Sequence, residues 1–231
     1  DVSIGNEAFR KCTALTDITI GNSVISIGID AFVDCINLKC TVYENANYIG
    51  NSSNPYVILI SAVSRDIAYA KVHKNTHVIC CGAFAGCSEL TSIEIPFVGA
   101  TKAETENTNH FGYIFGASYV HDTWKYVPES LKTVVITGGK KIDDDAFTSC
   151  RGLTSVKIPN GTISIGHSAF YGCAGLTSIE IPNSVSTIDS CAFSGCTGLL
   201  RVTVGSGVTG IDSSAFAGCY KLIEVVNLSS L

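Results

Sequence analysis

The 231-residue sequence predicts a β-rich solenoid of about nine coils, each with a short strand and a short helical turn. Three observations support this fold class. The marker Ala-Phe-x-x-Cys occurs seven times, an isoleucine and a leucine keep fixed places around it, and a strand-like pattern, Leu-x-x-Ile-x-Ile, follows it. The commonest spacing between markers is 23 residues, and a constant repeat of about 20 to 50 residues is typical of stacked repeats, in which each unit buries its apolar face against its neighbours.

The marker sets the frame of the repeat. An isoleucine lies four residues before each marker alanine, a leucine lies seven residues after it, and four of the six spacings between markers are 23 residues. The copies begin at Ala8, Ala31, Ala83, Ala146, Ala169, Ala192 and Ala215. We expect each marker to form one helical turn. Polar residues before it, such as Asp143, Asp144 and Asp145, suit a helix N-terminal cap better than a calcium loop, because they lack the spacing and the glycine of such a loop.

The strand pattern accounts for the irregular spacings. Its nine copies start at Leu15, Leu38, Ile67, Leu90, Leu131, Leu153, Leu176, Leu199 and Leu222. Alternating apolar positions predict short strands with one buried face, and proline or glycine after them predicts the turns. Two units, 44–66 and 97–130, are enlarged and have lost the marker.

The pattern Leu-x-x-Ile-x-Ile-Pro-x-x-Val-x-x-Ile-x-x-x-Ala-Phe-x-x-Cys resembles the BspA-like leucine-rich repeat family. The resemblance covers most of the chain, and the two enlarged units depart from it. It implies a right-handed, curved leucine-rich-repeat solenoid in a secreted or cell-surface protein of host-associated microbes, with a role in adhesion. We therefore expect residues 1–231 to form a single leucine-rich-repeat domain. The family brings no catalytic residues with it.

Composition excludes several other classes. Charged residues make up 15% of the chain, the net charge is −5, and there is no basic cluster larger than Lys140-Lys141, which argues against a nucleic-acid binder. The longest apolar runs are too short to span a membrane. The absence of methionine and an opening that looks like the middle of a repeat predict a mature product or an excised segment.

Seven of the 11 cysteines share one repeat position, so we expect a column of free, buried thiols rather than disulfides. Cys40, Cys80, Cys81 and Cys191 lie outside that column, and a bridge from Cys40 to Cys80 or Cys81 is an open alternative. His73, His77, Cys80 and Cys81 have the ligand types of a zinc site, but a turn with surface histidines is the favoured interpretation. No nucleophile elbow, phosphate loop or dinucleotide fingerprint is present, so we predict no enzyme, no cofactor and no metal.

The enlarged unit 97–130 is the candidate binding site. It holds seven of the 20 aromatic residues and the single tryptophan, and long insertions on a rigid scaffold commonly carry function. The candidate binding residues are Trp124, Tyr119, Tyr126, Tyr113, His110 and His121, together with Tyr69 on the outward strand face. The competing interpretation is that these rings pack a small core of their own. Both hold if the phenylalanines are buried and Trp124 or Tyr119 is exposed.

The sequence therefore predicts an extracellular or cell-surface binding or adhesion module, monomeric and without catalysis. Its expected partner is a protein or glycan on a host or neighbouring cell. A structural spacer that displays other domains is the alternative, and an enzyme is the remote one.

Overall fold

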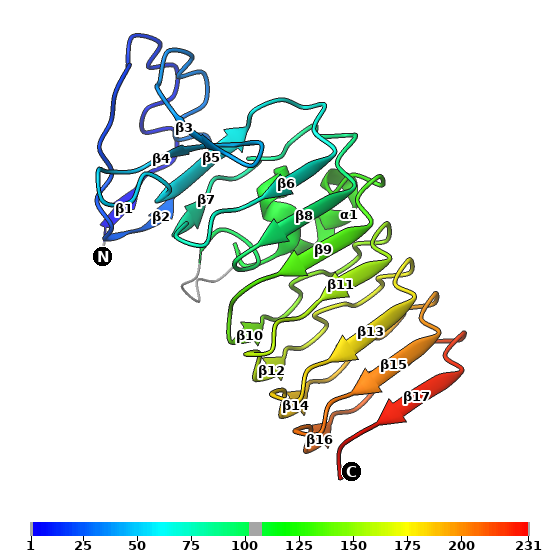
Figure 1. The fold of residues 1–231 in the computed structure, drawn as a ribbon. Helices are drawn as coiled ribbons and strands as arrows, with labels where there is room; N and C mark the ends of the chain where they lie inside the picture. Colours follow the sequence, from blue (N-terminus) through cyan, green and yellow to red (C-terminus); the bar gives the residue numbers. More distant parts are fainter. Residues whose placement is uncertain (1, 102–107, 231) are drawn as a thin grey trace.

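The computed structural model describes residues 2–101 and 108–230. It is a β-solenoid of about 10 turns, which confirms the predicted fold class (Figure 1). One row of parallel strands carries the Leu-x-x-Ile-x-Ile segments. In this row, β6 (Tyr69–Lys71), β8 (Ser92–Ile95), β9 (Thr133–Ile136) and β11 (Ser155–Lys157) form one sheet, and β13 (Ser178–Ile181), β15 (Arg201–Val204) and β17 (Glu224–Asn227) form another. The inward residues of these strands, such as Ile93, Val134 and Ile179, are buried.

A second row of two-residue strands ends at the isoleucine that precedes each marker. It consists of β10 (Lys141–Ile142), β12 (Ser164–Ile165), β14 (Thr187–Ile188) and β16 (Gly210–Ile211), paired in that order and in parallel. Equivalent isoleucines therefore pair directly, as Ile142 with Ile165 and Ile165 with Ile188. This register is the structural reason for the fixed isoleucine in the sequence.

The marker segment forms consecutive turns instead of the expected helical turn. In the coil that contains Phe147, Asp145 and Ser149 have positive φ angles of 55° and 61°, which a right-handed helix does not allow. These turns direct alternate N–H groups to the next coil. Asp145, Phe147 and Ser149 donate to the carbonyls of His167, Ala169 and Tyr171 at 2.9, 2.7 and 2.7 Å.

Two columns of side chains run through the marker segments. The rings of Phe147, Phe170, Phe193 and Phe216 stack in parallel with successive centroid separations of 5.1, 5.0 and 5.1 Å. The marker cysteines form the second column. The thiols of Cys35, Cys173, Cys196 and Cys219 donate a hydrogen bond to the phenylalanine carbonyl one coil earlier, whereas Cys12 in the first coil is exposed and not buried as expected. Cys173 and Cys196 reach Phe147 O and Phe170 O, both at 3.1 Å. Burial raises the pKa of the Cys196 thiol to about 12, so this thiol stays protonated at pH 7.

The amino-terminal coils differ from this pattern. β1 (Val2–Ile4) pairs in parallel with β2 (Val24–Ile27), and no strand forms at the copy that starts at Leu15. The enlarged unit 44–66 adds an antiparallel meander of β3 (Thr41–Tyr43), β4 (Ala46–Ile49) and β5 (Ile58–Ala62), and β5 then pairs in parallel with β7 (Val78–Ile79). The buried residues accordingly form two clusters, a small one around Phe32 and Val78 and a large one that runs from Ala46 to Ala215.

Candidate functional site

The described part of the enlarged unit, residues 97–101 and 108–130, contains three short helices. These are η1 (Phe111–Phe115), η2 (Val120–Asp122) and α1 (Thr123–Tyr126). All five residues of η1 are buried, and its two phenylalanines continue the ring column that the marker would otherwise supply. Phe115 lies 6.3 Å from Phe84, and Phe111 lies 5.0 Å from Phe147. The unit has thus lost the marker sequence but keeps the aromatic packing, which fixes it rigidly to the solenoid.

Helix α1 is held against η1 by a close contact. A Cβ on Gly112 would lie 2.6 Å from Oγ1 of Thr123, so only glycine allows this approach. Thr123 is buried, and its Oγ1 lies 3.3 Å from Nδ1 of His110. Because α1 is a single turn, it depends on these contacts for its position.

Three rings project from this support, and we call them the aromatic surface: Tyr119, Trp124 and Tyr126. Their exposed fractions are 73%, 49% and 46%. The guanidinium of Arg151 lies 5.6 Å from the centre of the Trp124 ring, and Nζ of Lys125 lies 5.5 Å from it. Lys125 also pairs with Asp122 at 2.5 Å. Exposed rings flanked by cations suit contact with a protein or a sugar, because the rings offer apolar area and the cations offer hydrogen-bond donors.

The remaining predicted residues of the unit divide into two groups. His121 is exposed in η2, next to the aromatic surface in the chain. Tyr113 and His110 are only 4% and 3% exposed, so they support the surface from within and do not offer contact area. Burial lowers the pKa of His110 to about 4, which keeps the ring neutral at pH 7. The phenylalanines are buried, which confirms that the unit packs a small core, and Tyr119 and Trp124 are exposed, so binding at these rings stays a prediction.

Tyr69 lies apart, on β6 of the outward strand face. It is partly buried, and its hydroxyl donates to Oε1 of Glu94 at 3.2 Å. Lys71 pairs with the same carboxylate at 2.8 Å, and Arg201 pairs with Glu224 at 2.6 Å further along the face. These four charges are matched in pairs within the chain.

The structure separates the residues that resemble a zinc site. His73 stacks on Tyr56 with 3.8 Å between ring centroids, Nδ1 of His77 lies 3.1 Å from Asn22 O, and Cys80 is buried. In residues 2–101 and 108–230, no three His, Cys, Asp or Glu side chains converge as a metal site would need. All 11 cysteines are free thiols in the described structure, so the alternative bridge from Cys40 to Cys80 or Cys81 does not form there.

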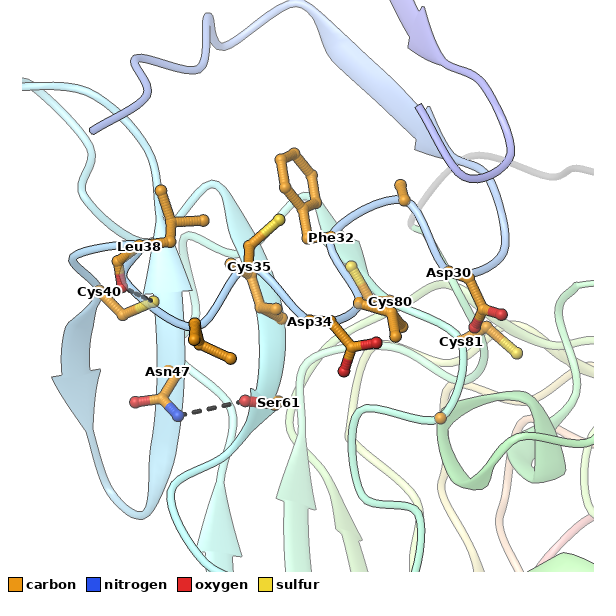
Figure 2. A pocket seen from close by; sticks show the side chains of 15 residues that line it. Asp30, Phe32, Asp34, Cys35, Leu38, Cys40, Asn47, Ser61, Cys80 and Cys81 are labelled. Atoms are coloured by element: carbon orange, nitrogen blue, oxygen red, sulfur yellow. Dashed lines mark hydrogen bonds between the residues drawn. The ribbon is translucent and has the colours of Figure 1, made fainter. Parts of the chain in front are cut away.

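A cleft that the sequence did not predict lies between the second marker and the enlarged unit 44–66. Its volume is about 600 Å³, and Figure 2 shows the side chains that line it. The walls are residues 30–36, Leu38 and Cys40 on one side, and Asn47, Ile60, Ser61 and 80–82 on the other. The available signal was the missing marker between Ala31 and Ala83, which leaves half a coil unaccounted for.

Comparison with known proteins identifies the family of the repeat. A family model described as the BspA type leucine rich repeat region matches residues 62–104 and 124–231 in six copies. No curated protein matches the chain. None of the helices in the part of the chain that the structure describes is long and apolar enough to cross a membrane.

Solved structures share the fold. A leucine-rich repeat protein from Bacteroides ovatus is 23% identical over 96% of this chain and 63% of that protein, with a TM-score of 0.52. The leucine rich repeat protein of T. pallidum is 21% identical over 83% of this chain and 84% of its own length, with a TM-score of 0.50. A leucine rich cell surface protein of Faecalibacterium prausnitzii is 26% identical, with a TM-score of 0.49, and the match covers 99% of this chain but only 52% of that protein. The chain thus spans between half and two thirds of the F. prausnitzii and B. ovatus proteins.

Proposed function

Because the chain belongs to the BspA-type leucine-rich repeat family, we propose that it is a non-catalytic binding module, folded as one leucine-rich-repeat domain. In this proposal it contacts a protein or glycan at a cell surface through Tyr119, Trp124 and Tyr126. The surface location and the role in adhesion are parts of the proposal that rest on the family.

The observation that carries the proposal is the exposure of these three rings on a rigid support. Large exposed aromatic side chains leave water favourably when a partner covers them, and tryptophan and tyrosine are enriched at the energetic centres of interfaces. Since η1 and Thr123 already hold the backbone of α1, the ordering cost of binding there falls mainly on the exposed side chains.

A non-catalytic role agrees with the protonation chemistry of the described residues. The largest pKa shifts belong to buried groups: the column thiols, Cys80, Tyr48, Tyr113 and His110. In each case burial is the first cause, and the shift favours the neutral form. Neutral buried thiols and phenols are poor nucleophiles, so they suit packing better than catalysis.

The test is a binding screen of the purified chain against extracellular-matrix proteins and a glycan array. We expect a ligand whose affinity falls at least tenfold in the variant Tyr119→Ala/Trp124→Ala. The matched control is Tyr171→Ala/Tyr220→Ala, which removes two other exposed rings (47% and 87% exposed) and should leave the affinity unchanged.

Two results would contradict the proposal. A ligand that both variants bind equally well would transfer the site to another surface, such as the strand face that carries Tyr69. Absence of binding to every protein and glycan would favour the structural spacer, the second candidate function. Circular dichroism of each variant shows whether the fold is intact.

A further inference from the structure

The second marker, Ala31 to Cys35, lacks the neighbour that the other interior markers have. The segment next to it in the solenoid is the end of β5, where the N–H of Ala62 donates to Ala83 O at 2.7 Å, as Phe147 does to Ala169. Ala62 thus occupies a phenylalanine position but supplies no ring. Phe32 stacks on Phe9 at 5.2 Å, and in the described residues no second ring stacks on it.

This interruption leaves three backbone donors open. In the first marker, Glu7, Phe9 and Lys11 donate to Ile29, Ala31 and Val33 of the next coil at 2.9, 2.8 and 2.8 Å. The equivalent N–H groups of Asp30, Phe32 and Asp34 have no acceptor within residues 2–101 and 108–230. They belong to an interior coil, and all three residues line the cleft. Phe32 is buried and Asp30 is half-buried, and buried backbone N–H groups nearly always find a partner, so this row of open donors indicates an edge ready to pair.

The walls of the cleft offer apolar area beside these donors. Ile36 and Val33 are 76% and 40% exposed at its rim, and Leu38 and Ile60 lie further along its walls. Figure 2 shows Asp30, Phe32 and Asp34 in order along one stretch of backbone, with Cys80 and Cys81 on a neighbouring segment. Burial raises the pKa of the Cys81 thiol to about 11, so the thiols add no negative charge at pH 7.

The charge of the cleft comes from two carboxylates. Asp30 and Asp34 have no ion-pair partner among the described residues, and Asp34 is exposed. At the corresponding positions the last three complete coils carry uncharged residues: Ser168 and Gly172, Cys191 and Gly195, and Ser214 and Gly218. The guanidinium of Arg10 also interacts electrostatically with both carboxylates, but it is paired with Glu7 at 2.8 Å, so a net negative charge remains. The cleft therefore combines a row of hydrogen-bond donors with a local negative charge that repels anions and attracts cations.

We propose that this cleft binds an extended, basic and apolar peptide segment of a partner protein. Carbonyls at alternate positions of the peptide accept from the N–H groups of Asp30, Phe32 and Asp34, as the next coil would. Apolar side chains of the peptide contact Ile36 and Val33, and lysine or arginine residues at its ends pair with Asp30 and Asp34. Backbone pairing supplies affinity and the flanking charges supply selectivity, as in other cases of strand addition. This site is separate from the aromatic surface and does not depend on it.

The first experiment uses the fluorescein-labelled peptide Lys-Ile-Ala-Phe-Val-Lys and measures fluorescence anisotropy with the full chain. We expect saturable binding, and weaker binding of the matched peptide Glu-Ile-Ala-Phe-Val-Glu by at least tenfold. In hydrogen exchange followed by NMR, the amides of Asp30, Phe32 and Asp34 should exchange at least tenfold more slowly when the basic peptide is bound.

Protein variants separate the cleft from general electrostatics. Asp30→Asn/Asp34→Asn should weaken binding of the basic peptide roughly fivefold, the size expected for two exposed charge pairs. The control Asp17→Asn/Glu180→Gln changes the net charge by the same amount at exposed sites outside the cleft and should have no effect. Ile36→Ala, at the exposed rim, should weaken the binding of both the basic and the acidic peptide.

Three outcomes would overturn the proposal. They are no binding of the basic peptide, equal losses in the Asp30/Asp34 and Asp17/Glu180 variants, and binding without slower exchange of the three amides. Binding that persists in Tyr119→Ala/Trp124→Ala would show that the cleft acts independently of the aromatic surface, as the proposal requires. Loss of peptide binding in that variant would contradict it.

Discussion

The coils from Lys141 to Cys219 and the interrupted stretch from Asp30 to Gly82 are built from the same repeat with different results. In the regular coils each marker has a neighbour on both sides up to the last one, so its outward N–H groups and its ring have partners, and the thiols of Cys173, Cys196 and Cys219 bond to the preceding coil. In the interrupted stretch Phe32 has one ring partner and three neighbouring donors are open. The difference shows that a marker completes its backbone and ring contacts through its neighbours, and that a missing half-coil leaves an edge without a partner, which is where we propose a peptide binds.

The largest expected effect compares two phenylalanines of the ring column. Phe170 is fully buried between Phe147 and Phe193, so Phe170→Ala should lower the free energy of unfolding by about 3–5 kcal/mol. Phe32→Ala should cost at least about 1 kcal/mol less, because Phe32 stacks on one ring only. Urea unfolding followed by circular dichroism measures both. Equal costs would show that the interruption does not loosen the column.

The next effect concerns pH and the second enlarged unit. The pKa of His110 is about 4 in the folded chain, while the unfolded chain takes up the proton at the ordinary value of about 6.5. Below pH 6.5 the unfolded state therefore binds more protons, and stability falls as the pH drops from 6.5 to 4. Over this window His110 should contribute a loss of about 3 kcal/mol.

The check is a comparison of urea midpoints at pH 7 and pH 4.5 for the natural chain and His110→Gln. The pH-dependent loss should be smaller in His110→Gln, while the exposed control His121→Gln should behave like the natural chain. If all three chains lose the same stability, the buried neutral histidine is not the cause.

A smaller effect on stability is expected when a thiol is removed, and it should differ between the regular coils and the interrupted stretch. Cys173→Ala removes a fully buried thiol and its 3.1 Å hydrogen bond to Phe147 O, and should cost about 1–2 kcal/mol. Cys35 makes the same bond to Phe9 O at 3.0 Å but is only partly buried, so Cys35→Ala should cost less than about 1 kcal/mol. Thermal unfolding in a reducing buffer gives both values. A larger cost at Cys35 would contradict the ranking.

The smallest effect is expected at the aromatic surface. Asp122→Asn removes the exposed ion pair with Lys125 and should change stability by less than about 0.5 kcal/mol. The same substitution leaves the three rings in place, so ligand binding should change less than in the variant without Tyr119 and Trp124. A large loss of stability would show that the ion pair, rather than Thr123 and η1, holds α1.

Much of the fold could be predicted from the sequence, because periodic positions face the same neighbours in every coil. The regularly spaced leucines and isoleucines predicted the row of strands, and the shared cysteine position predicted the column of thiols. The marker was predicted as a helical turn, and this was wrong in detail. Residues such as Asp145 and Ser149 adopt positive φ without being glycine, which residue type alone does not reveal.

The aperiodic residues could be assigned only in part. Tyr113 and Tyr119 belong to one aromatic cluster in the sequence, yet one is 4% exposed and the other 73%. No repeat position constrains them, so their burial depends on how η1 closes the ring column between Phe84 and Phe147.

The sequence by itself determined the solenoid, its period and the columns of phenylalanine and cysteine, because each is set by stacking on an identical neighbour, and it located the two enlarged units as breaks in that period. Only the tertiary structure decided which rings of residues 97–130 face solvent and that a cleft opens beside Asp30, Phe32 and Asp34. Both depend on contacts between segments far apart in the chain at the places where the repeat is broken, and there no neighbouring coil repeats the pattern.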